Sequence, residues 1–93
     1  MYATLRWYSG NVELADRLAA RADEIRAAIG GVEGLRAYYL VRTDGGTVSV
    51  TVADDRSGAE ESNEVAARWI RENMPDVSAS PPSTSMGEVV LSM

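Results

Sequence analysis

The stretch that decides the fold is Leu35–Ala53, which reads LRAYYLVRTDGGTVSVTVA. Its two halves, residues 35–42 and 47–53, are rich in β-branched and aromatic residues, which favour strands. Between them lies Thr43-Asp44-Gly45-Gly46, whose Asp and Gly residues tolerate the positive φ of a hairpin turn. The stretch therefore predicts an antiparallel hairpin at the centre of the chain.

A strand and a helix are predicted before this hairpin. Residues 1–9 alternate two sets of side chains with a period of two, which is typical of a strand, and Gly10 breaks the pattern. Apolar residues then recur at three- and four-residue steps up to Ile29, with Asn11 as a suitable N-cap. This segment is predicted to be one amphipathic helix, ended by Gly30-Gly31.

A second helix and a last strand are predicted after the hairpin. Ser57-Gly58-Ala59-Glu60 is a capping box, and the helix that it opens runs to about Met74, before Pro75. Residues 76–85 form a Pro/Ser-rich connector, and residues 86–93 are predicted to be a strand. The resulting order is that of a ferredoxin-like βαββαβ domain over residues 1–93, an α+β fold. Right-handed crossovers place both helices on one face of a four-stranded antiparallel sheet.

The charge composition disfavours nucleic acid as a partner. The chain carries 14 acidic residues against nine cations, all of them arginine, for a net charge of −5, and the arginines are dispersed. Cysteine and histidine are both absent, which removes disulfides, thiolate catalysis, the commonest metal ligand and the commonest general base. We therefore predict neither a metal nor a cofactor.

The sequence predicts no contact with a membrane. No run of residues approaches the ~18 apolar residues of a membrane span, and no signal peptide precedes the first strand. A cytoplasmic location is expected, and the Arg-rich, Lys-free composition is typical of a bacterial source with a GC-rich genome.

The two faces of the predicted sheet carry different side chains. We assign the more apolar set to the face that the helices cover: Ala3, Leu5, Trp7, Leu35, Ala37, Tyr39, Val41, Val48, Val50, Val52, Val89 and Leu91. The uncovered face is then expected to carry Tyr2, Tyr8, Tyr38, Leu40 and Val90 among Arg, Thr and Ser residues. Because Tyr and Arg are enriched where proteins meet, this face predicts a homodimer. A solvated, Thr-rich face is the alternative, since Thr and Tyr are also good strand formers.

Three residues of the second helix are candidates for a site. Ser62 falls inside the apolar arc of that helix, so its hydroxyl either bonds a backbone carbonyl within the helix or faces a cavity. Asn63 lies at the edge of the arc, and Trp69 lies within it. Trp7 and Tyr39, on strands, are expected to face the same space between sheet and helices. These aromatic residues either fill the core or line a pocket for a small aromatic ligand.

The chain resembles the antibiotic-biosynthesis-monooxygenase-like group of the dimeric α+β barrel superfamily. The residues that carry the resemblance are Gly31-Val32-Glu33-Gly34-Leu35-Arg36-Ala37-Tyr38-Tyr39, then Asp54-Asp55-Arg56-Ser57-Gly58-Ala59-Glu60-Glu61-Ser62-Asn63, then Ala66-Ala67-Arg68-Trp69. The resemblance implies two sheets packed face to face across a two-fold axis, and a pocket in each subunit between sheet and helices.

The resemblance also implies an activity, cofactor-free oxygenation of an aromatic or polyketide-like compound. Quinone-forming members pair an Asn with a Trp one turn later, which points to Asn63 and Trp69 as catalytic residues, although this spacing is displaced here. Trp7, Tyr39 and Ser62 are the expected ligand-binding residues. Haem-degrading members need an axial His, which this chain lacks. The alternatives are a non-catalytic ligand-binding or accessory dimer and, against the acidic charge, an RNA-binding sheet.

Overall fold

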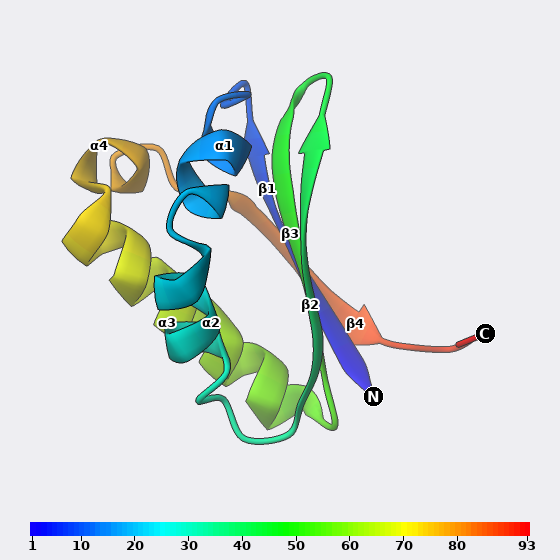
Figure 1. The fold of residues 1–93 in the computed structure, drawn as a ribbon. Helices are drawn as coiled ribbons and strands as arrows, with labels where there is room; N and C mark the ends of the chain where they lie inside the picture. The colour runs from blue at the N-terminus through cyan, green and yellow to red at the C-terminus, as the bar shows by residue number, and fades with distance from the viewer.

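In a computed structural model that describes residues 1–93, one sheet and four helical segments form two layers (Figure 1). The strands are β1 (Tyr2–Ser9), β2 (Leu35–Thr43), β3 (Gly46–Ala53) and β4 (Ser83–Glu88), and the helices are α1 (Leu14–Ala19), α2 (Ala22–Ile29), α3 (Arg56–Asn73) and α4 (Pro75–Ser78). Their order in the antiparallel sheet is β2-β3-β1-β4, and the helices lie on one face. The predicted ferredoxin-like α+β fold is confirmed.

The helices cover the opposite face of the sheet from the one that we assigned. On β1, Thr4, Arg6 and Tyr8 are buried under the helices, whereas Leu5 between them is 43% exposed. The buried residues of β3 follow the same alternation: Thr47, Ser49, Thr51 and Ala53. The assignment of the two faces was therefore wrong, because it placed the more apolar set of side chains under the helices.

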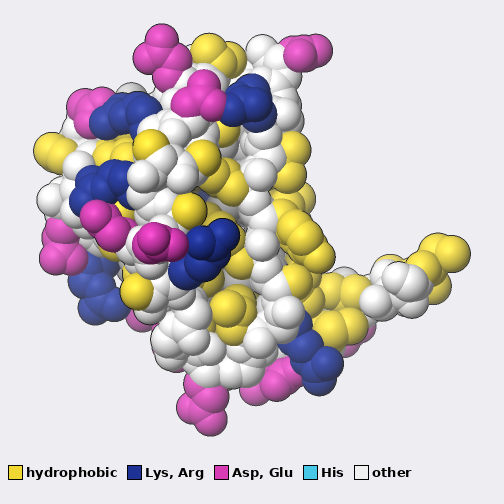
Figure 2. All heavy atoms as spheres, viewed as in Figure 1, with side chains coloured by type: hydrophobic (Ala, Val, Ile, Leu, Met, Phe, Trp, Pro, Cys, Tyr) yellow, Lys and Arg dark blue, Asp and Glu magenta, His cyan; other side chains and the backbone are white.

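The uncovered face of the sheet, which we call the open face, carries the apolar set instead. On β1, β2 and β3 it is formed by Ala3, Leu5, Trp7, Ala37, Tyr39, Val41, Val48, Val50 and Val52. Figure 2 shows hydrophobic side chains along the side of the molecule away from the helices. None of these nine residues is charged. The residues expected on this face, Tyr8, Tyr38 and Leu40, lie on the helix side, while Tyr2 shares their alternation and Val90 lies beyond β4.

A β-bulge explains why simple alternation fails at the start of β2. The pairing of β2 with β3 shifts between Leu35 and Ala37, so that Arg36 is the extra residue. Leu35 therefore faces the helices, as predicted, on the same side as Ala53, whereas Ala37 faces the open side together with Val52.

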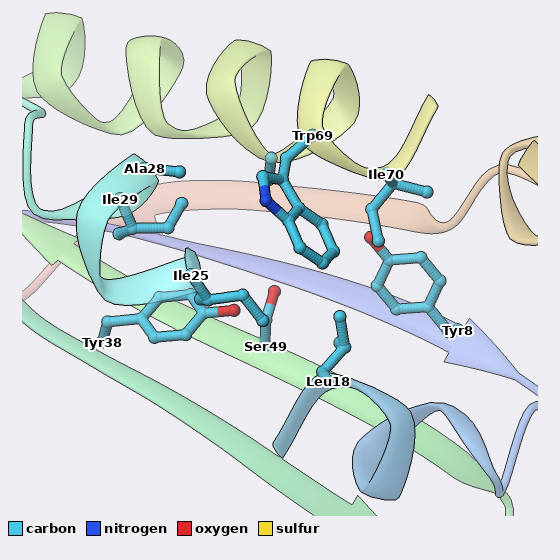
Figure 3. A pocket seen from close by; sticks show the side chains of 10 residues that line it. Tyr8, Leu18, Ile25, Ala28, Ile29, Tyr38, Ser49, Trp69 and Ile70 are labelled. Atoms are coloured by element: carbon cyan, nitrogen blue, oxygen red, sulfur yellow. The ribbon is translucent and has the colours of Figure 1, made fainter. Parts of the chain in front are cut away.

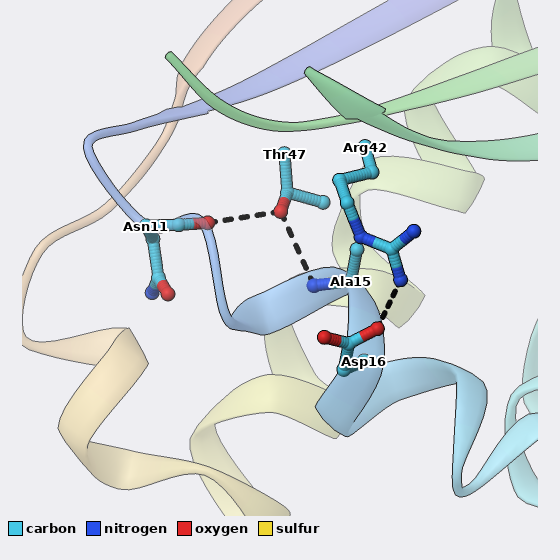
Figure 4. A network of polar contacts seen from close by, with 5 residues as sticks. All are labelled: Asn11, Ala15, Asp16, Arg42 and Thr47. Carbon is cyan, nitrogen blue, oxygen red and sulfur yellow. Dashed lines mark hydrogen bonds and ion pairs between the residues drawn. The ribbon is translucent and has the colours of Figure 1, made fainter. Parts of the chain in front are cut away.

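The first predicted helix is interrupted in the structure. It divides into α1 and α2 at Arg21, whose φ of −118° and ψ of 32° are not helical. The side chain of Asn11 does not cap α1. Instead, the Thr47 hydroxyl of β3 accepts a hydrogen bond from the Ala15 N–H at 3.2 Å and donates to the Asn11 carbonyl at 2.9 Å (Figure 4). A side chain of the sheet thus fixes the position of α1.

The cap of α3 also differs from the prediction. Asp55, rather than Ser57, is the N-cap residue, and its carboxylate accepts hydrogen bonds from the Gly58 N–H at 3.0 Å and the Ser57 hydroxyl at 2.8 Å. These bonds lower the pKa of Asp55. The end of the chain was also misjudged, because α4 and β4 occupy most of the predicted connector and β4 ends at Glu88.

The core lies where α1, α3 and α4 meet the helix-covered face of the sheet. Its buried cluster consists of Tyr8, Leu14, Leu18, Ile70, Met74 and Val77, with Ile25, Leu40 and Trp69 packed against it. Gly46 allows the hairpin to close against β1, since a Cβ at this position would lie 2.2 Å from the Tyr8 carbonyl oxygen. None of the helices is both long and apolar enough to cross a membrane.

Candidate functional site

A small apolar cavity lies between the helices and the sheet. Its volume is about 30 Å³, and its walls are Tyr8, Leu18, Ile25, Ala28, Ile29, Tyr38, Ser49, Ala66, Trp69 and Ile70. Figure 3 shows Trp69 entering this space from α3, and Tyr38 and Ser49 facing it from the sheet. The cavity by itself has room for about one water molecule, so an aromatic compound needs additional space.

That space is a groove of about 510 Å³ between α1, α2 and the edge strand β2. The groove shares Leu18, Ile25, Ile29 and Tyr38 with the cavity, so these four residues form the boundary between the two spaces. Its volume falls in the range of pockets that hold small organic ligands. Together, the groove and the cavity, which share these four wall residues, form the candidate site.

Trp69 is held in place by Arg21, at the break between α1 and α2. The Arg21 guanidinium lies 4.9 Å from the centre of the Trp69 ring, which is a cation–π contact. Arg21 also donates to the side-chain oxygen of Asn73 at 2.9 Å, and Asn73 donates to the Trp69 carbonyl at 2.9 Å. The interruption of the first helix therefore places a cation that fixes one wall of the site.

Two tyrosines supply polar groups to the otherwise apolar cavity. Burial raises the pKa of Tyr38 above its ordinary value of 10.0, and the neighbouring Tyr8 acts in the same direction, while the charge of Arg6 opposes them. Tyr38 is therefore a neutral hydroxyl at physiological pH, able to donate a hydrogen bond. The Tyr8 hydroxyl accepts hydrogen bonds from Arg6 Nη2 at 3.1 Å and Nε at 3.3 Å.

The structure does not bring all the predicted site residues together. Trp69 lines the cavity, as expected. Ser62 is 2% exposed and donates to the Ala59 carbonyl at 2.7 Å, which is the helix-internal alternative that we considered for it. Asn63 does not line the cavity: its side-chain oxygen accepts from Thr4 at 3.0 Å, and its carbonyl accepts from Arg6 at 3.4 Å.

Trp7 and Tyr39 are placed away from the cavity. Both lie on the open face, and Tyr39 is 60% exposed, so their expected position between sheet and helices was wrong. The strand residues that line the cavity are instead Tyr8, Tyr38 and Ser49. They were not predicted as site residues because they were assigned to the uncovered face of the sheet.

The chain is similar to known proteins in its structure rather than in its sequence. No model of a protein family and no curated protein matches the sequence. Among solved structures, Rv0793 from Mycobacterium tuberculosis is similar, with a TM-score of 0.68 and 17% identity over 98% of this chain and 96% of that one.

Two of the similar structures are those of oxygenases. SnoaB, a cofactor-independent oxygenase from Streptomyces nogalater, has a TM-score of 0.56 and 12% identity over 99% of this chain and 93% of its own. A monooxygenase from the gene ActVA-Orf6 of Streptomyces coelicolor, in complex with Nanaomycin D, has a TM-score of 0.55 and 19% identity over 98% and 91% of the two chains. The predicted likeness to monooxygenases of this type is thereby confirmed for the fold.

Proposed function

We propose that this protein binds a small aromatic or polyketide-like compound between the helices and the sheet and oxidises it with molecular oxygen, without a cofactor. The main support for the proposal is the apolar cavity lined by Trp69, Tyr8 and Tyr38. This cavity shares four wall residues with a groove whose volume is sufficient for a small organic ligand. The fold shared with a cofactor-independent oxygenase and a monooxygenase supports the same activity.

The proposed reaction requires only a few contributions from the protein. A phenolic anthrone that loses a proton from its CH₂ group becomes an electron-rich anion, which reduces O₂ directly; conversion of CH₂ to C=O then releases one water molecule. The protein has to exclude bulk water and to stabilise the anion by hydrogen bonds. The apolar walls serve the first purpose, and the hydroxyls of Tyr8 and Tyr38 serve the second.

We retain Trp69 as the residue that packs against the substrate, because it enters the cavity directly. Asn63 does not contact the substrate and acts indirectly, because its backbone carbonyl accepts a hydrogen bond from the Arg6 guanidinium and so positions it. A non-catalytic ligand-binding or accessory role is the second candidate, because the site contains no obvious base for the proton that the substrate must lose. A cytoplasmic location stays a prediction.

We also propose that two copies of the chain pair through the open face. Leu5, Val50 and Tyr39 form one row across β1, β3 and β2, and a face without charged residues can lie against its own copy without charge repulsion. The predicted homodimer was based on Tyr8, Tyr38 and Leu40, which lie on the helix side of the sheet. The apolar residues of the open face support a homodimer better.

The oxygenase proposal is tested by oxygen uptake with a panel of phenolic anthrones. We expect uptake by the wild type and a strong reduction in Trp69→Ala. Binding of the anthrones without uptake would favour the second candidate, and absence of both would refute the proposed site.

The dimer is tested by light scattering coupled to size-exclusion chromatography. We expect a mass of twice the 10.0 kDa chain for the wild type and of one chain for Val50→Glu. Ala27→Glu, on the exposed side of α2, is the matched control and should remain a dimer. A wild type that elutes as one chain would contradict the proposal.

A further inference from the structure

Arg6 is a buried cation without an acidic partner. Its residue is 7% exposed, and it is the only charged residue among those buried in the structure. Six arginines form ion pairs with carboxylates, all at the surface, and Arg6 is in none of these pairs. A buried charge ordinarily requires a counterion, because removing it from water is expensive.

The groups that contact Arg6 are neutral. Its three hydrogen bonds go to the Tyr8 hydroxyl, from Nε and Nη2, and to the Asn63 carbonyl, from Nη1. A guanidinium has more N–H groups than these bonds use. Since the Tyr8 oxygen accepts both bonds from Arg6, its own proton points elsewhere, and that hydroxyl donates to no group of the protein.

This charge lies behind the sheet-side wall of the cavity, next to two of the residues that line it. Tyr8 lines the cavity, and so does Ser49, which is paired with Arg6 across β1 and β3. Figure 3 shows Tyr8 and Ser49 on the sheet side of the cavity. The field of Arg6 also reaches Tyr38, on the boundary between cavity and groove. The only buried charge beside this apolar space is therefore positive, since the arginines near its outer walls, Arg21, Arg26 and Arg42, are each paired with a carboxylate at the surface.

We propose that the site selects ligands with an anionic oxygen on an aromatic ring. This oxygen accepts a hydrogen bond from the Tyr8 hydroxyl and serves as the counterion of Arg6, which lies behind Tyr8. Arg6 is a positioning residue here, because it acts through Tyr8. This inference rests on the proposed function, in that it uses the same cavity and groove, but it concerns ligand class and holds whether or not oxidation follows.

The test compares two probes that differ only at this oxygen: 4-nitro-1-naphthol, ionised at the pH of the experiment, and its neutral methyl ether. Calorimetric titration of the wild type is expected to give about tenfold tighter binding of the naphtholate, as a charge-assisted hydrogen bond provides. Arg6→Met should abolish this preference, and Arg6→Lys should restore part of it. Arg71→Met removes an exposed arginine outside all ion pairs and is the matched control, which should keep the preference.

A second readout separates a charge effect from a packing effect. The naphtholate absorbs differently from the naphthol, so the pKa of the bound dye can be measured from its spectrum. In the wild type this pKa should be lower than in free solution, whereas a dry cavity without Arg6 would raise it. Tyr8→Phe keeps the ring and tests the hydroxyl if Arg6→Met does not fold. Its expected result is a weaker preference and a smaller shift.

Each contrary outcome has one meaning. Equal binding of both probes by the wild type, or a preference that survives in Arg6→Met, overturns the inference and leaves the proposed site intact. Failure of the wild type to bind either probe overturns the site and the inference together.

Discussion

Removing the Thr47 hydroxyl should destabilise the fold by the loss of two hydrogen bonds, one buried and one partly buried. Thr47 is fully buried, and its hydroxyl joins the Ala15 N–H of α1 to the Asn11 carbonyl. Thr47→Val keeps the shape but leaves both backbone groups without this partner. A net hydrogen bond contributes about 1 kcal/mol and an unsatisfied buried group costs about 1–3 kcal/mol, so the expected loss is roughly 2–4 kcal/mol. For a domain of this size, that lowers Tm by roughly 10–20 °C.

Thr51→Val is the matched control for this prediction. Thr51 lies on the same strand and the same face and is buried to a similar degree, and its hydroxyl takes no part in the hydrogen bonds that hold α1. Its replacement should change the free energy of unfolding by less than about 0.5 kcal/mol. Urea denaturation followed by far-UV circular dichroism measures both variants. Equal losses in the two would refute the assignment of the α1 cap to Thr47.

Three further predictions concern α3, the site wall and the hairpin. The folded-state pKa of Asp55 is lowered, so its stabilising contribution is present above the unfolded pKa and is lost as the pH falls through the folded one; thermal unfolding of Asp55→Asn should therefore depend less on pH below about 4 than the wild type. Arg21→Met removes the cation over Trp69 and should lower the free energy of unfolding by about 1 kcal/mol, measured with urea; an unchanged midpoint would contradict the contact. Gly46→Ala, at a φ of 153° and against the Tyr8 carbonyl, should lower the stability by more than about 2 kcal/mol in the same assay, and tolerance of Ala would mean that the hairpin closes differently.

The order of the elements followed from local sequence patterns, but the choice of covered face did not. Both faces of the sheet alternate correctly, and the more apolar one was assigned to the helices because a monomer must bury it. In the structure, the apolar residues that cover the inner face come largely from the helices, such as Leu14, Leu18 and Ile70, so the strands can carry Thr and Ser there. The Val-rich face is left for a partner.

One signal in the sequence would have corrected this assignment. Gly58, in the first turn of α3, lies against Ala53, where an added Cβ would come within 2.9 Å of the alanine Cβ. Two small residues on either side of a short turn indicate close contact between the helix and the end of β3. That contact fixes Ala53, and by alternation Thr51 and Ser49, on the covered side.

The site was predictable only in part for the same reason. The position of Trp69 was predicted correctly because its helix has one apolar arc, which does not depend on the faces of the sheet. Tyr39 and Trp7 were misplaced with their strands. The break at Arg21 depends on contacts between distant segments, which no local pattern reveals. Arg6 and Tyr8 are only two residues apart on β1, but both were assigned to the wrong face.

The central claim, that a ligand binds between helices and sheet rather than on the open face, is tested most directly by the two indole N–H signals in a ¹H–¹⁵N NMR spectrum. The chain contains only Trp7, on the open face, and Trp69, in the cavity wall, and a Trp7→Phe variant assigns the signals. On titration with 4-nitro-1-naphthol, we expect the Trp69 signal to move and saturate while that of Trp7 stays in place. Movement of the Trp7 signal with that of Trp69 unchanged would contradict the account.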